Sequence, residues 1–209
     1  MSDNTSNNKR IAKNTLFLYI RMIFVLLVSL YSTRAILNAL GVVDYGIYNV
    51  VAGFVLMFAF LNSSMTNTIQ RFFNFERGNS NSDNLNKVYI TSLQIQITLG
   101  IITVVLLEII GIWYINNKMV IPVDRISAAM CVFQFSVISL FLLILQIPYG
   151  AAVVAHEKMG FYAIVSMVDV ILKLFIAFIL PYIPYDRLIY YGIFMLIISI
   201  ANIFLYFVC

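Results

Sequence analysis

The sequence predicts an all-α membrane protein with about six spanning helices, and its composition is the first reason. Hydrophobic residues make up 62% of the 209 residues, and charged residues only 11%. The mean hydropathy is +0.96. A soluble domain has about 45–50% apolar and about 25% charged residues, and it could not hide so much apolar surface from water. We therefore expect lipid to surround most of the chain.

The spacing of the apolar residues is the second reason. They form runs of about 20 residues or more, which is the length that a helix needs to cross the hydrocarbon core of a bilayer. The predicted helices cover residues 14–37, 45–72, 88–114, 126–149, 161–180 and 188–208. They would form one bundle over residues 14–209. Residues 1–13 are polar, with several Asn and Ser, and are predicted to be a disordered cytoplasmic tail.

Short polar segments separate the predicted helices. Residues 74–87 are rich in Asn, Ser and charge and are expected to be a loop, and residues 115–125 form the next link. The fourth helix is expected to stop at the Pro-Tyr-Gly cluster of residues 148–150, because proline and glycine interrupt helices. A cleavable signal peptide is not expected, since the first apolar run exceeds the roughly 7–15 residues of a signal-peptide core.

The placement of Lys and Arg predicts the orientation. Cytoplasmic loops of membrane proteins carry an excess of these residues. With the N-terminus in the cytoplasm, the inner side holds Lys9, Arg10, Lys13, Arg71, Arg77, Lys87 and Lys158. The outer side then holds Arg34, Lys118, Arg125 and Arg187. This bias predicts a multi-pass protein with a cytoplasmic N-terminus.

Ionisable residues inside predicted helices are candidates for function, because a charge within the bilayer is costly. Arg21 lies about two turns into the first helix, where it either lines a cavity or reaches back to the headgroups. Asp169 and Lys173 share one face of the fifth helix at i,i+4 spacing, so they can pair. The pair either lines an ion or substrate site or is structural.

The cytoplasmic half of the second predicted helix is unusually polar. It carries Asn62, Ser63, Thr66, Asn67, Gln70 and Arg71. Four of these recur at the spacing of one helical face and would form a stripe directed at protein or water rather than at acyl chains. The stripe either lines a cavity or bonds neighbouring helices together. Gln94 in the third helix is a weaker candidate of the same kind.

Several kinds of chemistry are poorly supported. One histidine, His156, and two distant cysteines, Cys131 and Cys209, cannot supply a usual zinc site. The sequence has neither a Gly-rich phosphate loop nor a nucleophile elbow, so an enzyme, a cofactor and a catalytic residue are not expected. The net charge of +4 comes without a basic patch that interleaves aromatics, which argues against a nucleic-acid partner.

Two stretches of the sequence resemble a known family. The first comprises NTLFLYIR at residues 14–21 and TRAILNALGVVDYGIY at residues 33–48; the second comprises AHEKMGFY at residues 155–162 and VDVILK at residues 168–173. Both resemble the bacterial polysaccharide-export flippases of the O-antigen type, within the multidrug/oligosaccharidyl-lipid/polysaccharide superfamily. The turn from Leu40 to Tyr48 is the most specific part of the resemblance, which extends over essentially the whole chain.

This resemblance implies a transporter of the cell inner membrane. Members of the family have two lobes around a central cavity and move an oligosaccharide linked to undecaprenyl diphosphate to the periplasmic leaflet, for surface polysaccharide or lipopolysaccharide biosynthesis. The implied mechanism is alternating access. The chain holds one lobe's worth of helices, so we expect an N-terminal lobe of a longer protein or a chain that pairs with a second copy. Membrane lipids and the polysaccharide synthesis machinery are the other expected partners.

The chemistry of such a cargo suggests roles for the candidate residues. Arg21, Arg71 and Lys173 are candidate cations for the diphosphate. The amides of Asn62, Asn67, Gln70 and Gln94 are candidate sugar contacts. Asp169 is the candidate for ion coupling.

Two other functions stay open. A multidrug or cation antiporter of the same superfamily would need a buried acid, and Asp169 could serve, although Lys173 lies within pairing distance. Alternatively, the chain is a non-transporting scaffold that helps to assemble a polysaccharide export complex.

Overall fold

The computed structural model describes residues 2–78, 82–156 and 158–208, and the regular structure within these ranges is entirely helical. Side chains are described from Thr15 onward, except those of residues 61–63, 82–83 and 208. The elements are α1 (Ser2–Leu56), η1 (Met57–Ala59), α2 (Phe60–Gly78), α3 (Ser82–Asn117), η2 (Val123–Arg125), α4 (Ile126–Ala155), α5 (Met159–Ile179), η3 (Leu180–Tyr182) and α6 (Arg187–Val208). The predicted all-α class is confirmed for the described residues.

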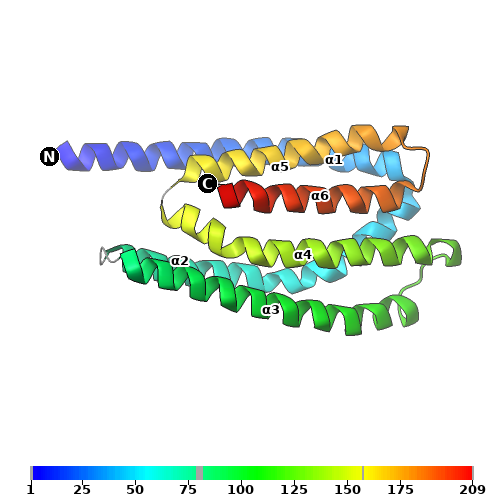
Figure 1. Ribbon diagram of the computed structural model, residues 1–209. Helices are drawn as coiled ribbons and strands as arrows, with labels where there is room; N and C mark the ends of the chain where they lie inside the picture. Colours follow the sequence, from blue (N-terminus) through cyan, green and yellow to red (C-terminus); the bar gives the residue numbers. More distant parts are fainter. Residues whose placement is uncertain (1, 79–81, 157, 209) are drawn as a thin grey trace.

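The helices lie roughly side by side in an elongated bundle (Figure 1). α4 runs through the middle, with α5, α6 and most of α1 on one side and α2 and α3 on the other. We call one end of the bundle the Gly41 end; it holds Gly41, η2 and η3. The opposite end, where α2 and α4 finish, is called the Ala155 end.

Five helical stretches of the described chain are long and apolar enough to cross a membrane. They are Thr15–Gly78, Asn84–Asn117, Val123–Ala155, Met159–Tyr182 and Arg187–Phe207. Such a set is typical of a multi-pass membrane protein. The first stretch, with 64 residues, is about twice as long as the next and therefore contains more than a single crossing needs.

The first stretch reverses its direction at Gly41. The backbone there has φ 81° and ψ 167°, whereas the residues on either side are helical. Figure 1 shows α1 running to the Gly41 end and then turning back toward α2. Only glycine adopts such a φ without a steric penalty, so Gly41 is the residue that allows the reversal. The connection that we expected between residues 37 and 45 is in fact confined to this one glycine.

Two polar segments are more helical than predicted. Residues 2–13, expected to be a disordered tail, continue α1, and most of residues 74–87, expected to be a loop, belongs to α2 and α3. Elongating an existing helix adds one hydrogen bond for each residue that is fixed, so a long apolar helix readily extends into polar flanks.

The fourth helix does not end at residues 148–150 as predicted but continues to Ala155. Pro148 lies inside α4 and is buried. Proline is tolerated within membrane helices because neighbouring groups satisfy the carbonyl that it leaves free. The Pro-Tyr-Gly cluster was therefore a misleading signal, since its effect on a helix depends on the groups that surround it.

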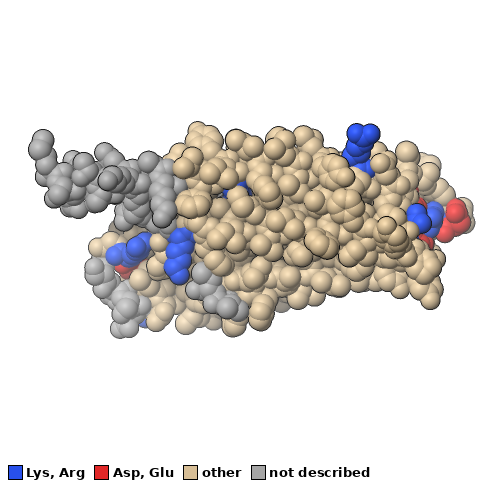
Figure 2. Space-filling view, turned by 90° about the horizontal axis from the view of Figure 1, so that it is seen from above, with Lys and Arg blue, Asp and Glu red and all other residues tan. Residues whose placement is uncertain are grey.

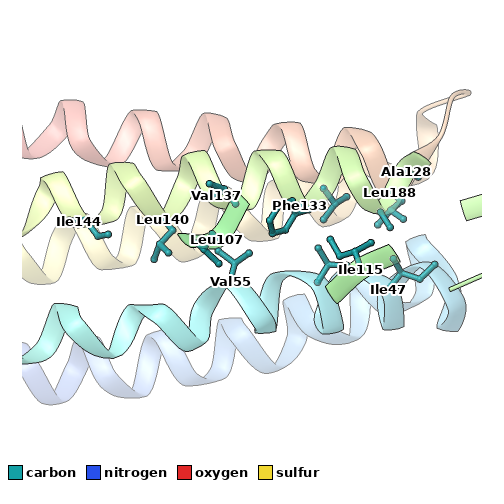
Figure 3. Packing of buried hydrophobic residues seen from close by; sticks show 13 residues of the cluster. Ile47, Val55, Leu107, Ile115, Ala128, Phe133, Val137, Leu140, Ile144 and Leu188 are labelled. Atoms are coloured by element: carbon teal, nitrogen blue, oxygen red, sulfur yellow. The ribbon is translucent and has the colours of Figure 1, made fainter. Parts of the chain in front are cut away.

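The main core lies where α4 meets α3 and the second arm of α1. Figure 3 shows Val55, Leu107 and Phe133 converging there, and all three side chains are almost completely buried. Small residues bring the helices close together: a Cβ at Gly100 would lie only 2.8 Å from the ring of Phe141. Close approach at small residues is the usual way in which membrane helices gain packing energy.

The outer surface is apolar around the middle of the bundle. On the face shown in Figure 2, nearly all Lys, Arg, Asp and Glu lie toward the two ends. Large apolar side chains such as Leu30, Ile109 and Phe204 are each more than 60% exposed. Exposed apolar side chains of this kind on α1, α3 and α6 would be unfavourable in water but are what acyl chains require.

Candidate functional site

A cavity of about 500 Å³ lies between α1, α4, α5 and α6. We call it the central cavity. Its charged lining residues, within the described part of the chain, are Arg21, Asp169 and Lys173. Apolar side chains such as Val55 and Leu140 form much of the remaining wall. Polar groups thus meet inside the bundle although the exterior of its middle is apolar.

Asp169 is the centre of a hydrogen-bonded group. Its Oδ2 accepts a hydrogen bond from Lys173 Nζ at 2.7 Å, and its Oδ1 accepts one from Asn202 Nδ2, also at 2.7 Å. Lys173 lies one turn further along α5, and Asn202 comes from α6. The pairing predicted from the i,i+4 spacing is therefore confirmed, and both carboxylate oxygens are engaged.

Arg21 approaches the cavity from α1. Its guanidinium carbon lies 4.5 Å from the centre of the Tyr162 ring, a cation–π contact with α5. Its Nε is buried and has no hydrogen-bond partner among the described residues. Arg21 therefore packs against the cavity wall, and no carboxylate lies within ion-pair distance of it in the described chain.

The charges of the central cavity do not balance. Arg21 and Lys173 carry two positive charges, and Asp169 carries one negative charge. An unpaired charge away from water is unfavourable, so an anion in the cavity would be stabilised by Arg21. The central cavity is accordingly suited to a ligand with a negatively charged group.

Serine hydroxyls add acceptors to the same cavity. Ser136, Ser166 and Ser199 each donate to the backbone carbonyl four residues earlier, at 2.8 to 3.1 Å. Because the hydroxyl proton is used in this way, each oxygen faces the cavity mainly as an acceptor. Such oxygens suit a ligand that carries hydroxyl donors.

The other predicted site residues lie elsewhere. Asn67, Arg71 and Gln94 are exposed and Gln70 is half-buried; these four are on α2 and α3 and do not line the central cavity. The side chain of Asn62 is outside the described residues. The buried face of α2 is apolar instead, with Ile69 and Phe73 packed against α4. A cavity role for this group stays a prediction.

The sequence interpretation missed Asn202 and Tyr162. Asn202 is the only amide side chain in α6, and an isolated amide in an apolar helix is a signal that could have been used. Tyr162 gives no such signal, because its importance comes from the position of α1 over its ring.

A second charged group lies at the Gly41 end. Arg125 donates to Asp44 Oδ2 at 3.0 Å and to Asp186 Oδ2 at 2.7 Å. Arg187 donates to the backbone carbonyl oxygens of Ala39 and Pro181. These bonds join the reversal at Gly41 to the segments that precede α4 and α6. We call Arg125, Asp44 and Asp186 the Arg125 cluster.

Polar side chains also join helices at the Ala155 end. Arg77 of α2 donates to the backbone carbonyl of Ala155, and Asn84 donates to Glu76 at 3.2 Å. No group of three or more His, Cys, Asp or Glu residues able to hold a metal ion occurs within the described ranges.

Compared with models of known families, with curated proteins and with solved structures, the chain gives no match. The functional argument therefore depends on the residues and the geometry of this molecule.

Proposed function

We propose that the chain is one six-helix lobe of a transporter that moves an oligosaccharide linked to undecaprenyl diphosphate across the bacterial inner membrane. The observation that carries this proposal is the central cavity, where Arg21 and Lys173 face a single acid inside an apolar bundle. The resemblance of residues 14–21, 33–48, 155–162 and 168–173 to the O-antigen type of flippase supports the same function.

The proposed topology has six crossings. The reversal at Gly41 divides the stretch Thr15–Gly78 into two membrane segments, and the other four apolar stretches supply one each. We place the Ala155 end in the cytoplasm, because Arg77, Lys87 and Lys158 flank its connections.

The cargo matches the chemistry of the cavity. Its diphosphate would contact Arg21 through charge-assisted hydrogen bonds, which are stronger than hydrogen bonds between neutral groups. Its sugar hydroxyls would donate to the oxygens of Ser136, Ser166 and Ser199. Its polyprenyl chain would stay in the surrounding lipid. Alternating access would then move this lobe against a second lobe or a second copy, with the cavity near the bilayer midplane.

An antiporter of cations or drugs is less well supported. Such a pump needs a carboxylate that can accept a cation, whereas both oxygens of Asp169 are already engaged by Lys173 and Asn202. A non-transporting scaffold would have no need for an unpaired arginine inside the bundle. Asp169 stays the candidate for coupling transport to an ion, which would have to displace Lys173 or Asn202 from its carboxylate oxygens.

The test replaces Arg21 in intact cells that depend on this protein for surface polysaccharide. Arg21→Ala should reduce export by at least about tenfold, because one charge-assisted contact with phosphate is worth about 1.5–3 kcal/mol. Membrane insertion should be unchanged. Arg34→Ala is the matched control, since Arg34 is exposed on the same helix and does not line the cavity. Normal surface polysaccharide in the Arg21→Ala cells would contradict the proposal.

A further inference from the structure

A group of polar side chains lies where α5 and α6 meet in the central cavity. On α5, Ser166 and Asp169 are three residues apart, and on α6, Ser199 and Asn202 have the same spacing. Residues at this spacing share one face of a helix. All four line the central cavity, and the hydrogen bond from Asn202 to Asp169 joins the two helices. We call these four residues the oxygen patch.

The oxygen patch presents lone pairs to a ligand. Ser166 and Ser199 donate their hydroxyl protons to backbone carbonyls, so each hydroxyl oxygen is left as an acceptor. The Oδ1 of Asn202 is buried and has no hydrogen-bond partner among the described residues. Asp169 adds a negative charge to these neutral oxygens. Oxygen atoms are the ligands that hard metal cations prefer.

The charge of the oxygen patch fits a monovalent cation. Asp169 is the one carboxylate that lines the central cavity in the described part of the chain. Sites for divalent cations generally combine several carboxylates, and a divalent ion here would keep an unbalanced charge inside the bundle. One positive charge balances Asp169 completely.

The ammonium group of Lys173 supplies this charge. Its Nζ lies 2.7 Å from Asp169 Oδ2, the distance of a charge-assisted hydrogen bond. An ammonium group is a compact point charge, so it can stand where a monovalent metal ion would bind. The side chain of Lys173 lines the cavity and is 36% exposed. Shortening it would therefore open the position of Nζ to ions and water from the cavity.

Arg21, the other cation of the central cavity, is held at a different level. Its guanidinium packs on the ring of Tyr162, which precedes Asp169 by seven residues, or about 10 Å along α5. Within the described chain it forms no ion pair with Asp169. Asp169 is thus balanced by Lys173 alone, and Arg21 stays available to an anionic cargo.

We propose that the oxygen patch is a binding site for a monovalent metal cation, sodium or potassium, and that the ammonium group of Lys173 occupies this site in the original chain. A metal ion binds only when Lys173 leaves Asp169. The use of the site in transport rests on the proposed function, in which Asp169 is the candidate for ion coupling. The occupation of the site by Lys173 does not depend on that function.

The experiment compares the original chain with Lys173→Ala, both as full chains in detergent. Thermal unfolding is measured in sodium, potassium, ammonium and choline chloride at equal concentration. Sodium or potassium should raise the melting temperature of Lys173→Ala by about 3 °C or more above the value in choline, because an ion that binds only the folded chain stabilises it. The original chain should melt at the same temperature in all four salts.

The choice of salts separates the possible ligands. A larger rise in sodium than in potassium, or the reverse, identifies the preferred ion. Ammonium carries the chemical group that the substitution removes, and it should also stabilise Lys173→Ala. A rise in ammonium without any rise in sodium or potassium would show that the position accepts only N–H donors, and it would overturn the metal assignment.

Two further variants control for effects of salt on the whole molecule. Asp169→Asn/Lys173→Ala lacks the carboxylate, and Lys118→Ala removes a lysine at the Gly41 end, outside the central cavity. Neither should respond to sodium or potassium, and a response of either as large as that of Lys173→Ala would overturn the proposal. Lys173→Gln, whose amide can still donate to Asp169 without a charge, replaces Lys173→Ala if that variant cannot be purified. An equal melting temperature in sodium, potassium and choline for the variant measured would also overturn it.

The polysaccharide assay of Arg21→Ala separates this inference from the proposed function. If Arg21→Ala cells export normally while Lys173→Ala still responds to sodium or potassium, the proposed function fails and the cation site stands. If export is lost in Arg21→Ala while Lys173→Ala responds to neither ion, the cation site fails alone.

Discussion

The Arg125 cluster and the central cavity contain similar residues in opposite situations. Arg125 donates to two carboxylates, so its charge is more than balanced at the Gly41 end. Arg21 contacts an aromatic ring, and its Nε has no hydrogen-bond partner within the described residues. The difference teaches that an arginine with satisfied donors holds helices together, whereas one with unsatisfied donors next to a cavity is suited to a ligand. Stability and transport should therefore respond differently to changes at the two places.

The largest loss of stability is expected at the Arg125 cluster. In Arg125→Ala, Asp44 keeps its charge but loses its partner, although only 9% of its side chain is exposed. We expect a loss of about 2–3 kcal/mol in the free energy of unfolding, below the range for a fully buried pair because Arg125 is 32% exposed. Thermal unfolding in detergent measures this loss. Combining Arg125→Ala with Asp44→Asn should recover part of it, and an unchanged melting temperature in Arg125→Ala would remove the distinction between the two regions.

A smaller loss is expected at the reversal that brings Asp44 to the Arg125 cluster. A Cβ at position 41 would meet no atom within 4 Å, so Gly41→Ala tests the backbone conformation alone. Placing an L-residue at φ 81° and ψ 167°, a region that is essentially restricted to glycine, should cost about 1–3 kcal/mol. Gly46→Ala is the matched control, because it also adds a Cβ in open space but has no positive φ. Equal melting temperatures for Gly41→Ala and Gly46→Ala would show that a residue other than glycine adopts the backbone conformation at position 41 without strain.

The smallest effect on stability is expected inside the central cavity. Asp169→Asn keeps an oxygen that can accept from Lys173. Its new NH2 group would face the Nδ2 of Asn202, so the Asn202 amide must turn over to let its Oδ1, which has no partner among the described residues, accept from it. We expect a change of less than about 1 kcal/mol, because an ion pair of partly exposed groups contributes little. Transport should nevertheless stop responding to an imposed proton gradient. An Asp169→Asn protein that is still driven by the gradient would show that this carboxylate is not the coupling group.

The features that the sequence predicted correctly depend on residues that are close together in the chain. The helical class and the Asp169–Lys173 pair follow from hydropathy and from i,i+4 spacing, and both are confirmed. The helix ends were less accurate, because the extension of α1 to Ser2 and of α4 beyond Pro148 depends on surroundings that a local pattern does not include.

Contacts between distant residues could not be predicted in the same way. Arg125 and Asp44 are 81 positions apart, and Asn202 and Asp169 are 33 apart. Their meeting depends on how each helix is rotated about its axis, which periodicity alone does not give. The polar stripe of α2 illustrates this limit: its spacing identified a common face for Asn67 and Gln70 but not the neighbour toward which that face points.

The distance along the chain between Asp44 and Arg125 also has a consequence for biosynthesis. A ribosome adds about 5–20 residues per second, so Arg125 emerges roughly 4–16 s after Asp44, which is 81 positions earlier. During this interval the first helical hairpin must persist with its acid unpaired. The bonds of the Arg125 cluster can form only after the start of α4 is made, and the bond with Asp186 later still. The completed cluster would thus mark a stage of assembly that precedes the packing of α6, and a quality-control protease would meet chains stalled before it as hairpins with a charged, unpaired tip.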